Sequence, residues 1–200
     1  MKIQLIREAG AKEALLGLSL SKGCPMDRVA EVAVNLSSKD GGHNKILESI
    51  YVWLDITAPR YWWQEADTYR LSTKQSDSTM HTIHKRYLMQ EDFEIPIWPA
   101  TLTRLNLLVD DYIAMKNDKK DTTETLVRLK NELPEGFLQR RVWVMNYKCI
   151  RNIMLQRRDH RLPQWHVFCT YIMKNIEHPE LLPTLSDRQL LDTFPLSQVA

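Results

Sequence analysis

The stretch ILESIYVWLDIT, residues 46–57, determines the fold class that the sequence predicts. It is rich in β-branched and aromatic residues, which strands favour, and Pro59 ends the run. We therefore predict a β-strand over residues 46–57. The next residues, RYWWQEADTY at 60–69, are expected to form a short helix.

Before this strand, the chain first alternates and then becomes helical. KIQLIRE, residues 2–8, alternates apolar and polar side chains as a strand does. AKEALLGLSL (11–20) and PMDRVAEVAVNL (25–36) are typical of helices. Pro25 is expected in the first turn of the second helix, where a missing N–H costs little. SSKDGGH, residues 37–43, breaks the pattern with two glycines.

After the strand, helical patterns dominate. From Ala100 onward, one predicted helix carries Leu102, Leu105, Val109 and Ile113 on a single stripe. Further helical segments are expected at DTTETLVRLKNEL (121–133), at PQWHVFCTYIMKNI (163–176) and, after a strand-like start, within RVWVMNYKCIRNIMLQR (141–157). The tail from His178 is expected to be short helix and loop. This order predicts a helix-rich α+β fold with a central sheet, in one domain spanning residues 1–200.

Composition indicates an ordinary globular protein. The chain has 200 residues, a hydrophobic fraction of 44% and a formal net charge of +2. Cys24, Cys149 and Cys169 cannot all pair, which favours a reducing compartment without a disulfide framework. No apolar run approaches a membrane span of about 20 residues, and the charged N-terminus is unlike a signal peptide. We expect a cytoplasmic protein with no membrane contact.

A long polar stretch, TYRLSTKQSDSTMHT at residues 68–82, follows the two tryptophans at 62 and 63. It contains many hydroxyl side chains and no glycine or proline. One interpretation is a loop or irregular strand that offers donors and acceptors to a polar ligand. The other is an exposed loop whose Ser and Thr side chains bond to their own backbone.

Basic residues concentrate between residues 128 and 161. The nine basic residues are Arg128, Lys130, Arg140, Arg141, Lys148, Arg151, Arg157, Arg158 and Arg161, and the three acidic ones are Glu132, Glu135 and Asp159. Such an excess suits an anionic partner such as a phosphate, a nucleotide or nucleic acid. The alternative is a solvated helix face.

Within this segment, Arg157 has a distinctive position. On a helix over residues 146–157, Asn146, Ile150, Ile153 and Arg157 fall along one side. Because an unpaired guanidinium beside buried isoleucines is costly, Arg157 requires either a carboxylate partner or a bound anion. Arg151 and Arg158 share a different side and are expected to be solvent-exposed charges.

Two longer segments resemble the flavin-dependent thymidylate synthases (ThyX). GGHNKILESIYVWLDITAPRYWW (41–63) has a Gly-His pair followed five residues later by Glu, then a strand and an aromatic-rich turn. NYKCIRNIMLQRRDHRLPQW (146–165) resembles the second landmark of that family, an Asn-starting helix that ends in Arg and is followed by Gln-Trp. ELP, residues 132–134, also fits. The resemblance covers roughly residues 40–170.

The family signature, RHRxxSxNExSxRY, corresponds to TYRLSTKQSDSTMH at residues 68–81. Arg70 and Ser78 are identical to it, and Thr73 and Gln75 keep the hydrogen-bonding type. The departures are Thr68, Tyr69, Ser76, Met80 and His81. The ordered outer landmarks therefore support the resemblance more than the signature itself does.

The resemblance implies a ThyX-like fold and the thymidylate synthase reaction. The family converts dUMP to dTMP with methylene-tetrahydrofolate, using FAD that is recharged by NADPH. Its members are homotetramers with sites built between subunits. The exposed aromatic rings at Tyr61, Trp62 and Trp63 would serve either that assembly or ordinary core packing.

The resemblance also implies site residues. Those at flavin-contacting positions are His43, Glu48, Arg70, Asn146, Lys148 and Asn152. Those at nucleotide-contacting positions are Thr73, Gln75, Ser76, Ser78, Lys130 and Arg157. Arg157 and Ser78 are the catalytic candidates. Arg157 would stabilise negative charge on the base as C5 becomes nucleophilic, and Ser78 would bind, since no base is evident beside it.

Several departures affect the phosphate site. Thr68 and Met80 stand where the family has arginines, and Glu65 replaces a glutamine. Either Arg140 or Arg141 then supplies the phosphate contact, or the substrate is not dUMP.

Two further functions remain open from the sequence. One is a diverged flavoenzyme that modifies another pyrimidine nucleotide. The other is a non-catalytic nucleic-acid-binding or structural protein, in which the basic segment and the six tryptophans bind. A metal site at His81 and His84 lacks a third ligand in useful spacing, so none is predicted.

Overall fold

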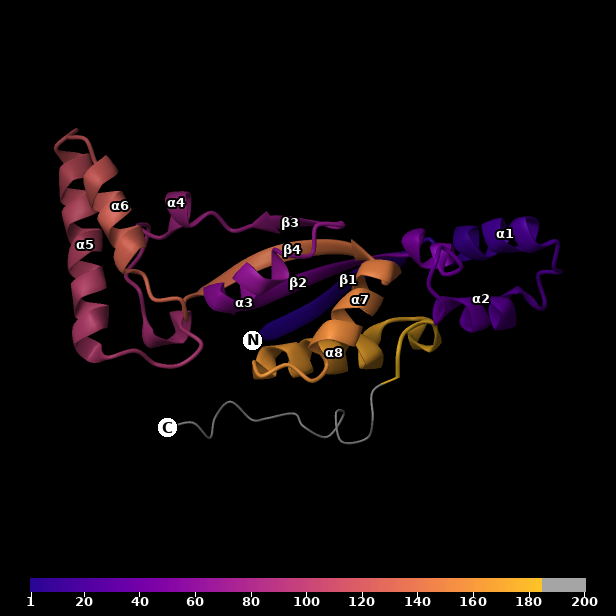
Figure 1. Ribbon diagram of the computed structural model, residues 1–200. Coiled ribbons are helices and arrows are strands. Elements are labelled where there is room, and N and C mark those ends of the chain that lie inside the picture. Colours follow the sequence, from indigo (N-terminus) through magenta and orange to yellow (C-terminus); the bar gives the residue numbers. More distant parts are fainter. Residues whose placement is uncertain (185–200) are drawn as a thin grey trace.

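A four-stranded antiparallel sheet in the order β1-β2-β4-β3 forms the centre of the computed structural model (Figure 1). The strands are β1 (Lys2–Ala9), β2 (Tyr51–Pro59), β3 (Ser72–Ser76) and β4 (Leu138–Asn146). The structure describes residues 1–184. With eight α-helices among these residues, it confirms the predicted α+β class.

The predicted strand at residues 46–57 begins later than expected. Lys45–Glu48 form a 3₁₀ turn, η1, and β2 starts at Tyr51. Ile46, Leu47 and Ile50 are all buried, at a spacing that suits a helical turn and not an alternating strand. From Val52 onward, alternate residues of β2 are buried, which is the expected pleated pattern.

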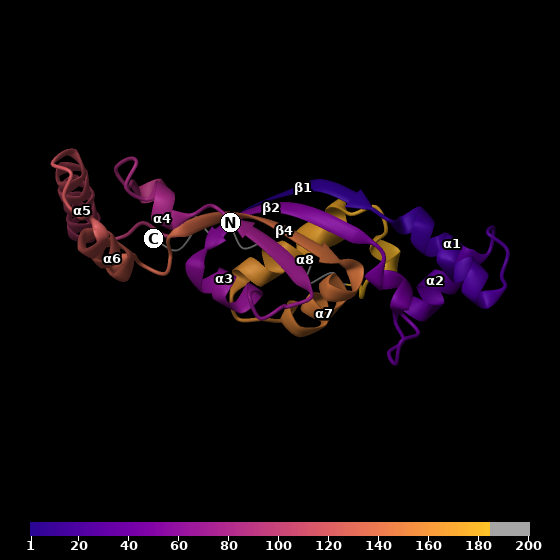
Figure 2. The same ribbon diagram turned by 90° about the horizontal axis from the view of Figure 1, so that it is seen from above.

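Helices cover one face of the sheet. These are α3 (Arg60–Ala66), α7 (Tyr147–Arg157) and α8 (Pro163–Asn175), and Figure 2 shows them on the same side of the strands. The core between the layers is aromatic, with Trp62, Trp63, Trp143, Trp165 and Phe168 all buried. Core packing, one of the two uses predicted for Trp62 and Trp63, is therefore the one found. Such large side chains contribute much of the buried apolar surface.

Two helical pairs lie at opposite ends of the sheet in both views (Figures 1 and 2). One end holds α1 (Ala11–Lys22) and α2 (Val29–Ser37). The other holds α5 (Pro99–Asn117) and α6 (Thr123–Glu132), which pack around a second apolar cluster. The connecting segments contain α4 (Thr79–Thr82), η2 (Gln90–Asp92) and, near the end of the described chain, η3 (Pro179–Leu181).

Two details of the predicted helices are wrong. Pro25 precedes α2 and lies in a turn, where its carbonyl accepts a hydrogen bond from the Arg28 N–H at 3.1 Å. Ile113 is 39% exposed, because the buried side of α5 is formed by Leu105, Leu108, Val109 and Tyr112. The predicted helical and loop tail beyond residue 184 lies outside the described residues.

The cysteines agree with the prediction that no disulfide framework is present. Cys24, Cys149 and Cys169 are free thiols. Burial raises the pKa of Cys149 to about 11 and that of Cys169 to about 12. Within residues 1–184, none of the helices combines the length and apolar character that crossing a bilayer would need.

Candidate functional site

The segment at η1 and the start of α7 meet through a cluster of three polar residues, Glu48, Asn146 and Lys148. Asn146 ends β4 and caps α7, accepting a hydrogen bond from the Cys149 N–H at 2.9 Å. Its Nδ2 donates to the Glu48 carbonyl at 3.4 Å. Lys148 Nζ lies 2.5 Å from Glu48 Oε1. We call these residues the η1–α7 cluster.

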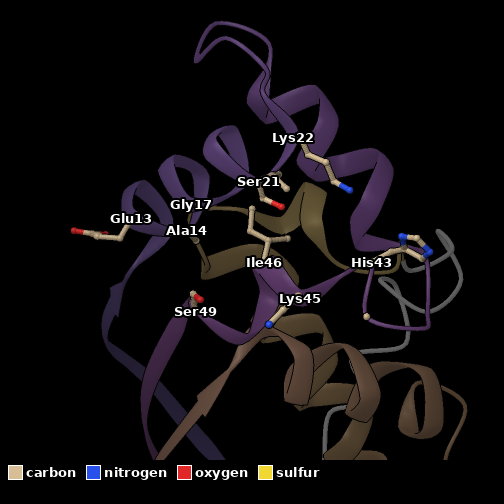
Figure 3. A pocket seen from close by; sticks show the side chains of 11 residues that line it. Glu13, Ala14, Gly17, Ser21, Lys22, His43, Lys45, Ile46 and Ser49 are labelled. Carbon is tan, nitrogen blue, oxygen red and sulfur yellow. The ribbon is translucent and has the colours of Figure 1, made fainter.

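His43 and Asn152 flank this cluster. His43 lies on the loop before η1 and lines a cavity of about 300 Å³ between that loop and α1 (Figure 3). Asn152 is half-buried one turn beyond Lys148, and its side chain has no hydrogen-bond partner among residues 1–184. Since Lys148 and Asn152 are i, i+4 neighbours on α7, one ligand can contact both.

The position of α1 relative to η1 depends on Gly10. This residue precedes α1 with a φ of +100°. A Cβ at this position would lie 2.2 Å from the Ser49 carbonyl oxygen. Glycine is therefore required both by its left-handed backbone and by the close approach of the segment after η1.

At the far end of α7, Arg157 has the carboxylate partner that its position requires. Its Nη1 lies 3.0 Å from Glu65 Oε2, and its Nε donates to the Tyr69 hydroxyl at 3.0 Å. The same Glu65 oxygen accepts from Trp165 Nε1 at 2.7 Å. His160 Nε2 lies 2.8 Å from Arg157 Nη1. We call these five residues the Arg157 cluster.

The Arg157 cluster is electrostatically balanced. The Arg157 side chain is 19% exposed and lies 5.2 Å from the Trp165 ring centroid. Burial raises the pKa of Tyr69, and the hydrogen bond from Arg157 opposes that shift. The phenol therefore stays neutral at neutral pH, and the charge of Arg157 is met by Glu65. A structural ion pair, one of the two predicted alternatives, is the one found.

Within the polar stretch, for which a loop or an irregular strand was predicted, Ser72–Ser76 form the edge strand β3. β3 pairs with β4, and Lys74 lies 4.6 Å from the centroid of the buried Trp143 ring. Because strand side chains alternate, Thr73 and Gln75 project from the opposite face of the sheet to Lys74. They therefore point away from the side that α7 and Arg157 occupy.

Hydroxyls beside this strand bond to the local backbone. Ser72 Oγ donates to the Tyr69 carbonyl at 2.6 Å, and Thr68 Oγ1 donates to the Glu65 carbonyl at 2.7 Å. Thr82 Oγ1 donates to the Ser78 carbonyl at 2.8 Å. These three hydroxyls thus bond to nearby backbone carbonyls, as the second interpretation of the stretch predicted.

The remaining predicted residues are spread along the same edge. Arg70 is exposed just before β3, Ser76 ends β3, and Ser78 is half-buried directly before α4. Lys130, from α6, donates to Thr79 Oγ1 at 3.0 Å, which brings it beside Ser78. The structure thus joins Lys130 to the end of the polar stretch, although they are about 50 residues apart in sequence.

The basic segment is largely neutralised by carboxylates. Seven of its nine cations have a carboxylate within 4 Å: Arg128, Arg140, Arg141, Lys148, Arg151, Arg157 and Arg158. Arg151, predicted to be a solvent charge, is buried and pairs with Asp40 at 3.1 Å. That prediction is wrong, since the end of α2 packs over this side of α7. Arg140 and Arg141, considered for phosphate binding, pair with Asp55 and Asp67.

Sequence reasoning missed part of the Arg157 cluster and one wall of the cavity beside His43. His160 and Trp165 lie on the chain just beyond Arg157, but nothing local predicts that both reach Glu65. The contribution of α1 to the cavity beside His43 was also missed. Gly17, in the middle of a predicted helix, was an available signal, because an interior glycine weakens a helix.

Lys148 from the predicted flavin group and Arg157 from the predicted nucleotide group lie at opposite ends of one helix. Lys148 and Arg157 are nine residues apart on α7, which corresponds to about 14 Å along the axis. Glu48 approaches the first of them and Glu65 the second. The described chain thus holds two separate polar centres on the helix-covered side of the sheet.

The chain is an α+β protein with a polar centre at each end of α7, the helix that follows β4.

No family model matches the chain, and no curated protein sequence matches it. Solved structures do match in fold. Two are ThyX of Helicobacter pylori, each with FAD and dUMP, at TM-scores of 0.70. One is 13% identical and covers 91% of this chain and 98% of its own, and the other is 14% identical and covers 96% and 100%. The chain therefore has a ThyX-like fold.

Proposed function

We propose that this protein is a diverged member of the flavin-dependent thymidylate synthase family. The reaction is the reductive methylation of dUMP to dTMP, with methylene-tetrahydrofolate as the carbon donor and NADPH as the reductant. The observation that carries the proposal is the meeting of Glu48 with Asn146 and Lys148 in a ThyX-like fold. These residues come from the two segments that resemble the family.

The residues around the η1–α7 cluster suit a flavin dinucleotide. They offer an amide at Asn152, an ammonium at Lys148, a carboxylate at Glu48 and an imidazole at His43, beside a cavity of about 300 Å³. In the proposed enzyme they hold FAD, together with Asn146 and Arg70. When bound, the flavin supplies the hydride that reduces the transferred one-carbon unit.

The nucleotide side of the proposed site centres on Arg157. Its Nη2 has no hydrogen-bond partner among residues 1–184, so it can donate to a pyrimidine oxygen while Nη1 keeps Glu65. Such a donor stabilises the negative charge that develops on the base. Ser78 and Lys130 act as binding residues in this proposal, with Thr73, Gln75 and Ser76 on β3.

The separation of the β3 residues from Arg157 supports a site that is shared between subunits of an oligomer. Thr73 and Gln75 project from the sheet face opposite to Arg157, so one chain does not direct all of the nucleotide residues at one point. In the proposed homotetramer, β3 of one subunit completes the site of another. The cytoplasmic location remains a prediction.

A second candidate function is the modification of a different pyrimidine nucleotide. It is favoured by the pairing of Arg140 with Asp55 and of Arg141 with Asp67, which leaves neither arginine free for a phosphate. The non-catalytic alternative loses support from the same pairing, because the basic segment offers less free charge to nucleic acid.

The visible spectrum of the purified protein tests the cofactor. We expect flavin absorbance, either as purified or after addition of FAD and gel filtration. Incubation with dUMP, methylene-tetrahydrofolate and NADPH then tests the reaction by the appearance of dTMP. Bound flavin without dTMP favours the second candidate, and a colourless protein that does not take up FAD contradicts both enzymes.

A further inference from the structure

A bulge in β1 turns the side chain of Glu8 toward the helix-covered face of the sheet. The register of β1 against β2 shifts between Leu5 and Arg7, so β1 has one extra residue at that point. Beyond the shift, Glu8 is paired with Val52, which is buried in the core between the sheet and its helices. Because paired residues of neighbouring strands point to the same face, Glu8 points there as well. Without the bulge, strict alternation from Leu5 would direct Glu8 to the opposite face.

Glu8 is held beside the segment that follows α8. Its Oε1 accepts a hydrogen bond from the buried Tyr147 hydroxyl at 2.5 Å, and its Oε2 accepts from the Glu177 N–H at 2.8 Å. The same Tyr147 hydroxyl accepts from the His178 N–H at 3.2 Å. Burial raises the pKa of Tyr147, and the hydrogen bond to Glu8 raises it further, so the phenol stays a neutral donor. Each carboxylate oxygen of Glu8 still has a lone pair for a second partner.

Three side chains in this place bring metal-ligand atoms together. One such atom from each of Glu8, Glu177 and His178 lies within 4.8 Å of the other two. Two ligand atoms bound to one tetrahedral Zn²⁺ are about 3.4 Å apart. The Glu177 side chain is exposed and makes no hydrogen bond within residues 1–184, so it can turn toward a shared ion. Small side-chain rotations therefore suffice to place all three atoms on one metal.

His178 has the carboxylate neighbour that a metal-bound histidine usually has. Its Nδ1 lies 3.1 Å from Glu180 Oε1. An ionised carboxylate only accepts hydrogen bonds, so Nδ1 carries the proton and Nε2 has the free lone pair. A carboxylate in this position orients the ring and makes the other nitrogen a better ligand. This hydrogen bond thus supports a metal site independently of the distances between the ligand atoms.

The carboxylates of this group have no basic partner in the described chain. Within residues 1–184, no lysine or arginine nitrogen lies within 4 Å of a carboxylate oxygen of Glu8, Glu177 or Glu180. Glu8 is half-buried, and a carboxylate that is partly removed from water needs a compensating cation. A neutral imidazole at His178 does not supply that charge. A divalent cation would compensate the carboxylates and use the imidazole as a ligand.

We propose that Glu8, Glu177 and His178 bind one divalent transition-metal ion such as Zn²⁺, and that Glu180 positions His178. Imidazole together with carboxylate suits this class of ion, and water can complete its coordination. The ion would join β1 to the segment after α8, so we expect a structural role that raises stability. The site uses none of the residues proposed for flavin or nucleotide, and it does not depend on the reaction proposed above.

Calorimetric titration with ZnCl₂, after removal of metal from the full chain with EDTA, tests the site. We expect one ion per chain. His178→Gln and Glu177→Gln each remove a ligand and should raise the Kd about a hundredfold, and Glu180→Gln should raise it about tenfold. His81→Gln and Glu91→Gln, at exposed residues of the same types elsewhere, are the matched controls and should leave the Kd unchanged. No binding by the wild type, or equal Kd values for all five variants, would overturn the proposal.

Thermal unfolding tests the structural role. Saturating ZnCl₂ should raise the melting temperature of the wild type, since the ion binds the folded chain. Glu177→Gln should lose this rise but keep the metal-free melting temperature, because the exposed Glu177 side chain makes no contact that folding needs. MgCl₂ at the same concentration should have little effect, as Mg²⁺ does not favour imidazole. Equal rises with both salts, or an undiminished rise in Glu177→Gln, would contradict the site.

Discussion

The Arg157 cluster and the cavity between α1 and the His43 loop differ in whether a carboxylate compensates their positive charge. At Arg157, Glu65 lies 3.0 Å away and a tyrosine, a tryptophan and a histidine complete the contacts. At the cavity, the lining residues Lys22, His43 and Lys45 have no ion pair among residues 1–184. A high density of basic residues along the chain therefore does not by itself leave free positive charge, because carboxylates from other elements neutralise most of it.

The paired cations instead connect elements of the fold. Arg151 joins α7 to the end of α2 across 111 positions, and Arg157 joins α7 to α3 across 92. Arg140 joins β4 to β2 across 85 positions. Each ion pair holds together segments that are distant in sequence. The basic segment therefore acts partly as a set of structural contacts on the sheet and its covering helices.

The most severe test of this comparison is Arg157→Ala. If Arg157 also serves catalysis, dTMP formation should fall by at least a hundredfold, the effect of removing one donor to a developing anion. FAD affinity should stay near that of the wild type, because the η1–α7 cluster is at the other end of α7. Arg158→Ala, at the neighbouring half-buried arginine, which does not pair with Glu65, is the control. Normal turnover in Arg157→Ala would mean that Glu65 and Arg157 are only structural.

Arg151→Met tests whether paired cations stabilise the fold. It keeps much of the side-chain volume but removes the ion pair with Asp40 and the hydrogen bond to the Ser38 carbonyl. Because Arg151 is buried, we expect the free energy of unfolding to fall by about 2 kcal/mol in urea denaturation. Arg140→Met removes an exposed pair and should change it much less. Equal losses would show that burial does not distinguish the two arginines.

Glu65→Gln should leave Arg157 without a carboxylate partner, as Lys22 and Lys45 are at the cavity beside His43. The substitution keeps an oxygen for Trp165 and removes the negative charge that compensates Arg157. The Arg157 guanidinium can then donate one more charge-assisted hydrogen bond to dUMP, so we expect the Kd for dUMP to fall about tenfold. Asp67→Asn, which releases Arg141 instead, is the matched control. A dUMP affinity that rises equally in both variants would indicate a general charge effect.

The smallest expected effect is a pH dependence of stability that comes from Cys149 and Cys169 in the main apolar core. Burial raises the pKa of Cys149 to about 11 and of Cys169 to about 12, so both remain protonated in the folded protein at pH 9. The unfolded chain, with thiol pKa values near 8.5, releases those protons, and stability therefore falls as pH rises. We expect the two thiols together to lower the free energy of unfolding by about 0.8 kcal/mol between pH 7 and pH 8.5. Cys24 should react with a thiol reagent long before the other two, and early labelling of Cys149 would contradict its burial.

The α+β class, most of the element types and the meeting of two segments could be predicted from the amino-acid sequence. The alternation in residues 2–8, the β-branched and aromatic run in residues 46–57 and the helical spacing around Ile150 and Ile153 are local features, so the sequence alone predicts these elements. The family landmarks also indicated that Glu48 and Asn146 belong together, and the structure joins them.

Which charges are free and which side chains share a face could not be predicted from the sequence, because both depend on contacts between distant segments. Arg151 seemed a solvent charge because Asp40 is distant in sequence, and Arg157 found its carboxylate in Glu65 on another element. Thr73 and Gln75 face away from Arg157 because the pairing of β3 with β4 sets the direction of every alternate residue. Ion pairing and strand register are non-local, since both depend on groups that the folded chain brings within a few ångströms.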